Sequence, residues 1–295
     1  MKQIRAVRFL LFGPIIVSLS FIGFVFWDLA QPSTLTVRVL DIGQGDSILI
    51  QTAGRRTILV DGGPDNTVIH KLGEYLPFYQ RTIDLVVLTH PDADHLMGLN
   101  EVLERYQVGA VLLTGVSNDS GAYQSFLELI ASRGVQTFFA GAIHEITIDN
   151  QTTLVVLHPS QPLIGQTVEE SNDASIVSQL RAGDFTVLLT GDAPQNIETA
   201  LLEGGVDVRS TVLKISHHGS RTASGEAFLR TVAPQLALIS SGRDNRFGHP
   251  HPSVVERLAA LGILMLNTQQ AGDITVKFGT GGISVSENGI EGLEK

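Results

Sequence analysis

Leu85-Val86-Val87-Leu88-Thr89-His90-Pro91-Asp92-Ala93-Asp94-His95-Leu96-Met97-Gly98 is the stretch of this chain that decides its fold. Its four leading apolar residues predict a short buried strand. Pro91 lacks an amide hydrogen and disfavours helical backbone at His90, so the strand should end there. We therefore expect the His-x-Asp-x-Asp-His run to form a loop, with a helix starting near Leu96.

The two histidines and two aspartates of this loop predict a metal site. Neutral imidazole and carboxylate are usual ligands of zinc, and carboxylates also suit manganese. One such residue alone would indicate a solvated turn, but four on one strand-terminal loop can point into the same cleft. The first candidate ligands are His90, Asp92, Asp94 and His95.

The composition is that of a folded, acidic protein. The 295 residues are 43% hydrophobic and 17% charged, enough for one large domain or two small ones at roughly 150 residues per domain. The formal net charge is -10, whereas proteins that hold duplex DNA by counterion release carry a basic stripe. A nucleic acid would have to be held locally, with metal ions supplying positive charge. The absence of cysteine excludes disulfides, thiolate ligands and a cysteine nucleophile.

The N-terminal segment predicts a membrane anchor. No charged residue occurs from Phe9 to Trp27, a run close in length to the roughly 20 residues that a membrane-spanning helix needs. Because Lys2, Arg5 and Arg8 precede this run, the positive-inside rule keeps the N-terminus cytoplasmic and places the rest of the chain outside.

A cleaved signal peptide and a soluble helix are the alternatives to this anchor. Trp27-Asp28-Leu29-Ala30 is a poor cleavage site, and Pro14 with the all-round apolarity disfavours a core helix. We expect an anchor and linker over residues 1–34, with membrane contact at residues 7–27, and a second domain over residues 35–295.

That second domain alternates strand and helix patterns, which implies a sheet core with helices outside. Strands are predicted at 35–40, 47–50, 57–60, 85–88, 110–113, 135–139, 146–148, 153–157, 175–180, 185–189, from 212, 236–239, 274–278 and 283–285, and helices at 67–76, 96–106, 122–132 and 254–260.

Three further strands end in residues that can carry chemistry. Asp61 precedes two glycines, Asp192 follows Thr190-Gly191, and the pair His217-His218 follows the strand that begins at Val212. A turn or a helix cap is the alternative for each carboxylate. Adjacent histidines face opposite ways if a strand continues, so one should bind metal and the other should touch substrate or support the ligands. His217 is the favoured ligand, with His218 left open.

The loop Arg243-Asp244-Asn245-Arg246-Phe247-Gly248-His249-Pro250-His251-Pro252 is basic and rich in histidine. In an acidic chain it is a candidate phosphate contact through Arg246 and His249, with a surface turn as the alternative. The aromatic content of 6% offers little support for a platform on which bases stack.

Taken in order, these motifs resemble the metallo-β-lactamase superfamily and, within it, the ComEC-type branch, the hydrolase-like domain of bacterial DNA-uptake proteins. The resemblance covers about Leu35 to Val285 and rests on Thr-His-x-Asp-x-Asp-His-Leu-x-Gly, Thr-Gly-Asp-Ala, Leu-Lys-Ile-Ser-His-His-Gly-Ser and Gly-His-Pro-His-Pro. It implies an α/β fold, a four-layer αββα sandwich, with two divalent metal ions at one edge of the sheets. Zn²⁺ and Mn²⁺ are the expected ions.

The resemblance also implies roles for individual residues. The implied metal ligands are His90, Asp92, Asp94, His95, Asp192 and His217 or His218. Asp94, Asp192 and His249 are expected to be catalytic, and the expected supporting or substrate contacts are Asp61, Asn172, Asp173, Lys214, Ser220 and Arg246. Asp92 stands where the superfamily commonly has histidine, and one further histidine of the usual set has no clear equivalent. The more oxygen-rich set shifts the metal preference towards manganese.

The expected function is a metal-dependent phosphodiesterase or nuclease that cleaves single-stranded DNA during DNA uptake. A hydroxide held between two metal ions near Asp192 would attack phosphorus. Hydrolysis of a small ester, lactone or phosphodiester is one alternative, and a non-catalytic, metal-stabilised binding module tethered to the membrane is another. The expected location is a single-pass membrane anchor with the hydrolase domain outside the cytoplasm. With one predicted span, the chain cannot itself be a DNA channel.

Overall fold

The computed structural model describes residues 17–23, 25, 33–243, 245–279, 281–287 and 290–294. Among these residues, no helix is both long enough and apolar enough to cross a membrane. The anchor expected at residues 7–27 lies largely outside the described residues, so it stays a prediction. From Thr34 onward the chain forms one compact unit, to which the following description applies.

Two mixed β-sheets form the centre of this unit. The larger sheet has the strand order β16-β15-β14-β1-β2-β3-β4-β5-β6, and the smaller has β13-β12-β11-β10-β9-β8-β7. The strand bounds are β1 Leu35–Val39, β2 Ile48–Gln51, β3 Thr57–Val60, β4 Thr82–Val87, β5 Gln107–Leu113, β6 Gln136–Phe139, β7 Glu145–Thr147, β8 Thr152–His158, β9 Val177–Ala182, β10 Phe185–Leu189, β11 Val212–Lys214, β12 Leu236–Ile239, β13 Leu264–Asn267, β14 Ile274–Gly279, β15 Gly282–Glu287 and β16 Ile290–Glu294.

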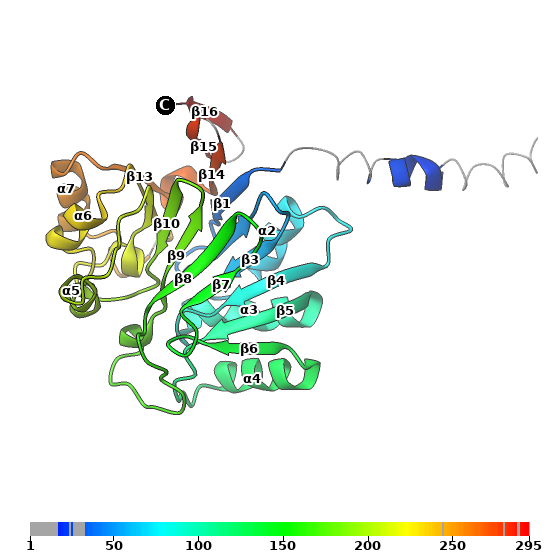
Figure 1. The fold of residues 1–295 in the computed structure, drawn as a ribbon, viewed down its shortest axis with the longest axis horizontal. Coiled ribbons are helices and arrows are strands. Elements are labelled where there is room, and N and C mark those ends of the chain that lie inside the picture. Colours follow the sequence, from blue (N-terminus) through cyan, green and yellow to red (C-terminus); the bar gives the residue numbers. More distant parts are fainter. Residues whose placement is uncertain are drawn as a thin grey trace, which may run out of the picture. The chain divides into compact units, whose positions relative to one another are not determined.

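Helices cover the outer face of each sheet (Figure 1). The helix bounds are α2 Thr67–Tyr75, α3 Ala93–Arg105, α4 Gly121–Arg133, α5 Gln195–Glu203, α6 Glu226–Val232, α7 Pro252–Ala260 and α8 Thr268–Ala271. Helices α2, α3 and α4 pack on the larger sheet, and α5, α6 and α7 pack on the smaller one.

The alternation of side chains along the strands builds the layers. In β3, Ile58 and Val60 enter the core between the sheets while Leu59 packs against the helices, as the two-residue period of a strand requires. In β11, Val212 likewise enters the core between the sheets, and Leu213 packs against the helices. Strands buried on both faces read as continuous apolar runs. The αββα sandwich expected from the sequence is confirmed.

The direction of the strands places the site. Strands β3 to β6 run parallel to one another, and so do β10 to β13. Parallel strands present their carboxyl ends at one edge, where ligands bind in open α/β sheets. The residues that follow β3, β4, β10 and β11 are the motif residues singled out in the sequence.

Candidate metal centre

The His-x-Asp-x-Asp-His run is only partly a loop, contrary to the sequence expectation. Helix α3 begins at Ala93, three residues before the expected start, because the Asp92 carbonyl already accepts hydrogen bonds from the amides of His95 and Leu96. Pro91 disfavours helical backbone only at His90, the residue before it, and does not prevent a helix from starting at Ala93. His90 follows strand β4, whereas Asp94 and His95 lie in the first helical turn.

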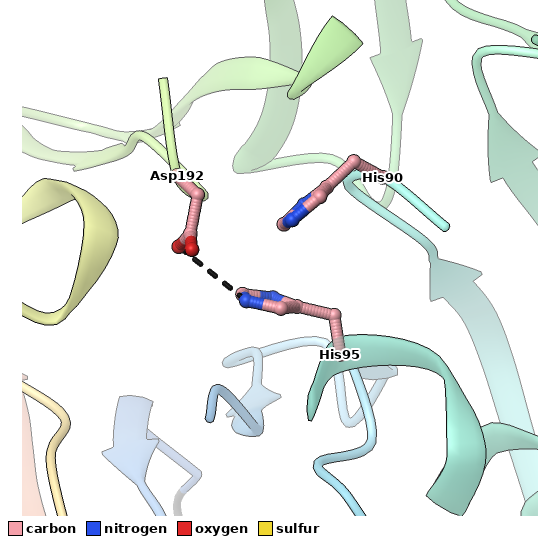
Figure 2. A group of neighbouring side chains, drawn as sticks. All are labelled: His90, His95 and Asp192. Atoms are coloured by element: carbon pink, nitrogen blue, oxygen red, sulfur yellow. Dashed lines mark ion pairs between the residues drawn. The ribbon is translucent and has the colours of Figure 1, made fainter. Parts of the chain in front are cut away.

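The first group of ligands consists of His90, His95 and Asp192, whose side chains point toward one another from three different segments (Figure 2). One nitrogen or oxygen from each residue lies within 4.8 Å of the other two. His95 Nε2 is 3.4 Å from Asp192 Oδ1. Segments about a hundred residues apart in sequence thus meet, as the strand directions require.

The second group consists of Asp94, His95 and His218, and it lies beside the first because His95 belongs to both. His218 Nε2 is 3.4 Å from Asp94 Oδ2 and 3.4 Å from Asp192 Oδ2. The two oxygens of Asp192 therefore face different groups, one toward His95 and the other toward His218. This carboxylate is placed to bridge two cations.

The donor atoms at this centre fit metal ions better than they fit a protein without them. Among the described residues, His90 Nε2, His95 Nε2, His218 Nε2 and Asp192 Oδ1 are buried and have no hydrogen-bond partner. A buried polar atom left unpaired costs about 1–3 kcal/mol. Four such atoms in two adjoining groups, all of types that bind Zn²⁺ or Mn²⁺, are consistent with a site for two metal ions.

The far nitrogen of each imidazole is held by the protein. Thr89 donates its amide and hydroxyl hydrogens to the two oxygens of Asp61 at 2.8 Å each, so its hydroxyl oxygen can accept from His90 Nδ1 at 3.0 Å. His95 Nδ1 donates to Asp61 Oδ2 at 2.8 Å, and His218 Nδ1 donates to the Ser240 carbonyl at 3.0 Å. With hydrogen on each Nδ1, every Nε2 is the atom that can offer a lone pair to a bound cation, as in metal-binding histidines.

Charge is concentrated at this centre. Burial raises the pKa of Asp192, but His218 and His95 lower it further, to well below its usual range. Burial lowers the pKa of His218, while Asp192 and Asp46 raise it, to about 9. The metal-free histidine therefore carries a proton at neutral pH. Metal binding must displace that proton, so it should be coupled to proton release.

Three residues at or next to the metal centre have strained backbone angles. Asp61, His217 and His218 have φ of 59°, 49° and 55°, in the left-handed region that residues other than glycine rarely adopt. Such conformations persist where the surrounding structure fixes them, and they concentrate at functional sites. They also explain why both adjacent histidines can face the centre, since β11 ends at Lys214 and the alternation of a strand no longer applies.

The sequence favoured His217 as ligand, whereas the geometry favours His218. His217 Nε2 is 3.8 Å from Asp192 Oδ2 and belongs to none of the ligand groups found among the described residues. Its Nδ1 lies 3.3 Å from the side-chain amide of Asn172. Burial lowers the pKa of His217, so the ring is neutral and, with Asn172 donating to Nδ1, carries its hydrogen on Nε2.

Asp46 is part of the centre and was not recognised in the sequence, where Gly43-Gln44-Gly45 indicated only a turn. Asp46 Oδ1 is 3.3 Å from His218 Nδ1, and Asp46 Oδ2 is 2.7 Å from Lys214 Nζ. Gly45 (φ 135°) lets the backbone before Asp46 pass close to the start of α3, because a Cβ there would overlap the carbonyl oxygen of Asp94. An acidic residue directly after Gly-x-Gly was the signal available.

The remaining expected residues divide between the centre and its surroundings. Asp92 is close to His90, with Oδ2 3.6 Å from Nε2, but like His217 it belongs to none of the ligand groups found among the described residues. Lys214 is buried against Asp46 instead of facing substrate. Asp173 accepts from Asn196, and the hydroxyl of Ser220 pairs with that of Thr222, so neither side chain is engaged with the metal groups.

His249 and Arg246 lie on the loop between β12 and α7. The His249 ring is 5.6 Å from that of His217 and 6.3 Å from that of His218. Burial, His218 and His217 lower the pKa of His249 to about 4, so it is neutral at pH 7. Arg246 is exposed.

The αββα fold and these adjoining ligand groups define the class of this protein, an αββα sandwich with a candidate centre for two metal ions. Residues 40–243 match the metallo-beta-lactamase superfamily, and the chain belongs to that family.

Among curated proteins the chain is 28% identical to ComE operon protein 3 of Bacillus subtilis (strain 168), over 90% of this chain and 36% of that protein. It is 31% identical to competence protein ComA of Neisseria gonorrhoeae, over 88% of this chain and 35% of that protein. The similarity to these two proteins extends over most of the chain, which spans about a third of their length.

Among solved structures, CmlA, a diiron beta-hydroxylase from Streptomyces venezuelae, superposes with a TM-score of 0.53 and 13% sequence identity. The match covers 84% of this chain and 55% of that chain. At this identity the likeness shows the fold alone.

Proposed function

We propose that this protein is a metal-dependent phosphodiesterase that cleaves single-stranded DNA in connection with DNA uptake. The observation that carries the proposal is the set of buried imidazole and carboxylate atoms that face one another without partners among the described residues. The similarity to a protein named for competence supports DNA as the substrate.

The ligand set supports the chemistry. His90, Asp92, Asp94, His95, Asp192 and His218 would hold two divalent cations, which when bound supply a water-derived nucleophile at neutral pH and neutralise phosphodiester charge. Asp192 faces both positions and would fix their spacing. The more oxygen-rich set keeps Mn²⁺ beside Zn²⁺ as the expected ion.

The histidines that do not bind metal would contact the phosphodiester. Neutral His217 carries hydrogen on Nε2, which points toward Asp192 and can donate to a non-bridging phosphate oxygen. Neutral His249 lies next to both His217 and His218, where its ring would exclude water from one side of the substrate. Hydrogen bonds preset in this way favour the transition state because they need no reorganisation.

Placement outside the cytoplasm is part of the same proposal. An uncleaved, single-pass anchor at residues 7–27 would hold the hydrolase domain on the outer side of the membrane, where incoming DNA arrives. The charge asymmetry of the first residues supports this orientation. Labelling of engineered cysteines on either side of the segment in intact cells would test it.

The activity is tested with labelled single-stranded DNA and the metal-stripped protein, to which Mn²⁺ or Zn²⁺ is added back. We expect cleavage that requires metal and that falls at least about a thousandfold in Asp192→Ala, several kcal/mol of transition-state stabilisation. Asp184→Ala, on the exposed turn between β9 and β10, is the matched control and should cleave normally.

Three results would contradict the proposal. Cleavage that survives Asp192→Ala would place the chemistry elsewhere. DNA binding without cleavage would indicate the membrane-tethered binding module, and turnover of small esters alone would indicate the other alternative.

A further inference from the structure

The loop between β12 and α7 carries an aromatic side chain into solvent beside the metal centre. Phe247 is 55% exposed. The tip of the loop is fixed by Asn245, whose side chain accepts from the His249 amide at 2.8 Å and donates to the carbonyls of Gly242 and His249 at 2.7 Å each. The ring of Phe247 is therefore held out by a closed turn.

The rings between this tip and the metal ligands form a continuous row. Phe247 and His249 are stacked, with centroids 5.8 Å apart and planes at 24°, the offset arrangement that aromatic pairs prefer. His249 is in turn 6.3 Å from the ring of the ligand His218. One imidazole, that of His249, thus lies between the exposed ring and the ligand His218.

Positive charge accompanies the ring. The guanidinium carbon of Arg246 is 5.2 Å from the centroid of Phe247, within range of a cation–π interaction. Arg246 is exposed and can reach a backbone phosphate. In a protein of net charge -10, a cation beside an exposed aromatic ring at the centre matches what single-stranded nucleic acid requires, which is stacking for a base and charge for its phosphates.

A single exposed phenylalanine is ordinary on a protein surface. Phe78, more exposed at 62%, shows this, since it precedes β4 at the end of the strand opposite His90. Phe247 differs because its loop is fixed, its ring joins the row that leads to the ligands, and a cation lies against it.

From these contacts we infer that Phe247 is a stacking platform for one nucleobase of a single-stranded substrate, next to the phosphate held at the metal centre. The inference rests on the proposed function and adds the way in which the substrate is recognised. The low aromatic content of the chain, which gave little support to stacking, does not exclude one well-placed ring. Stacking on a ring accepts any base, so cleavage should depend little on sequence.

The test compares wild type, Phe247→Ala, Phe247→Trp and the control Phe78→Ala in the 295-residue chain. The substrates are an oligonucleotide and an abasic oligonucleotide of the same length, which keeps the phosphates and lacks the bases. We expect Phe247→Ala to raise KM for the oligonucleotide about tenfold, as loss of one base stack does. Phe247→Trp should restore KM, and neither Phe247→Ala on the abasic substrate nor Phe78→Ala should change it.

The outcomes separate this inference from the proposed function. If wild type cleaves DNA and Phe247→Ala leaves KM unchanged, the stacking role is wrong and the nuclease stands. If wild type does not cleave, the proposed function fails, and fluorescence anisotropy of the same oligonucleotides decides the inference. Weaker binding by Phe247→Ala that is absent with the abasic oligonucleotide supports stacking, and equal binding overturns it.

Discussion

The metal centre has two regions that are built differently, a buried floor and an exposed rim. The floor comprises His90, His95, Asp192 and His218, which are all buried. The rim is the loop 245–251, whose backbone is closed by Asn245 while its side chains Arg246 and Phe247 reach solvent. In the floor, each imidazole is oriented by a buried contact. The fold therefore determines where cations would bind, and the rim can contact substrate without contributing to the core.

The largest effect is expected from Lys214→Ala, which removes the cation buried beneath the floor. Lys214 and Asp46 are both 1% exposed and 2.7 Å apart. The substitution takes from the buried Asp46 carboxylate the partner of its Oδ2 and leaves it with His218 alone, which should lower the free energy of unfolding by about 3–5 kcal/mol. Urea denaturation in the presence of a chelator measures this change without a contribution from bound metal.

Arg230→Ala is the matched control, because its pair with Glu226 is exposed on α6. This variant should lose less than about 1 kcal/mol. If the two variants were equally stable, the floor would not depend on its buried charges.

A smaller effect is expected from Asp61→Asn, which disturbs the orientation of two ligands. Asp61 accepts three hydrogen bonds, two from Thr89 and one from His95, and the amide group of asparagine cannot accept them all. Asparagine tolerates the left-handed backbone at this position, so the fold should survive. Metal affinity should fall about 10- to 100-fold, as measured by titration with Mn²⁺.

Two control variants should bind metal as tightly as wild type does. Asp65→Asn, at an exposed position just before α2, should bind metal as wild type does. Phe247→Ala in the rim should also leave metal affinity unchanged. A loss of metal in Phe247→Ala would remove the distinction between floor and rim.

The sequence predicted the fold well because the layers follow from local patterns. The strands 57–60, 185–189 and 236–239 are found with the predicted bounds as β3, β10 and β12, since each is a short apolar run that ends in a turn residue. Helices α5 and α6 and strand β13 were not predicted. The apolar side chains of these elements are buried mainly against the smaller sheet. Their hydrophobic patterns in the sequence are too short to indicate a helix or strand on their own.

The candidate site was predictable as far as it depends on strand ends. His90, His95, Asp192 and the pair His217-His218 follow apolar strands, so their convergence could be expected from the sequence. Asp46 could not be recognised in this way, because its role depends on Lys214, far away in the chain. Which of His217 and His218 is the ligand could not be predicted either. Both residues have left-handed backbone angles, so the alternation of side chains along a strand does not apply to them.

The most direct test of the account is the number of divalent ions that each chain binds, measured by isothermal titration and by elemental analysis after dialysis. The groups His90-His95-Asp192 and Asp94-His95-His218, two of the four found among the described residues, predict two Mn²⁺ or Zn²⁺ ions per wild-type chain and at most one in Asp192→Ala. A wild-type chain that binds no divalent ion, or an Asp192→Ala chain that still binds two, would contradict it.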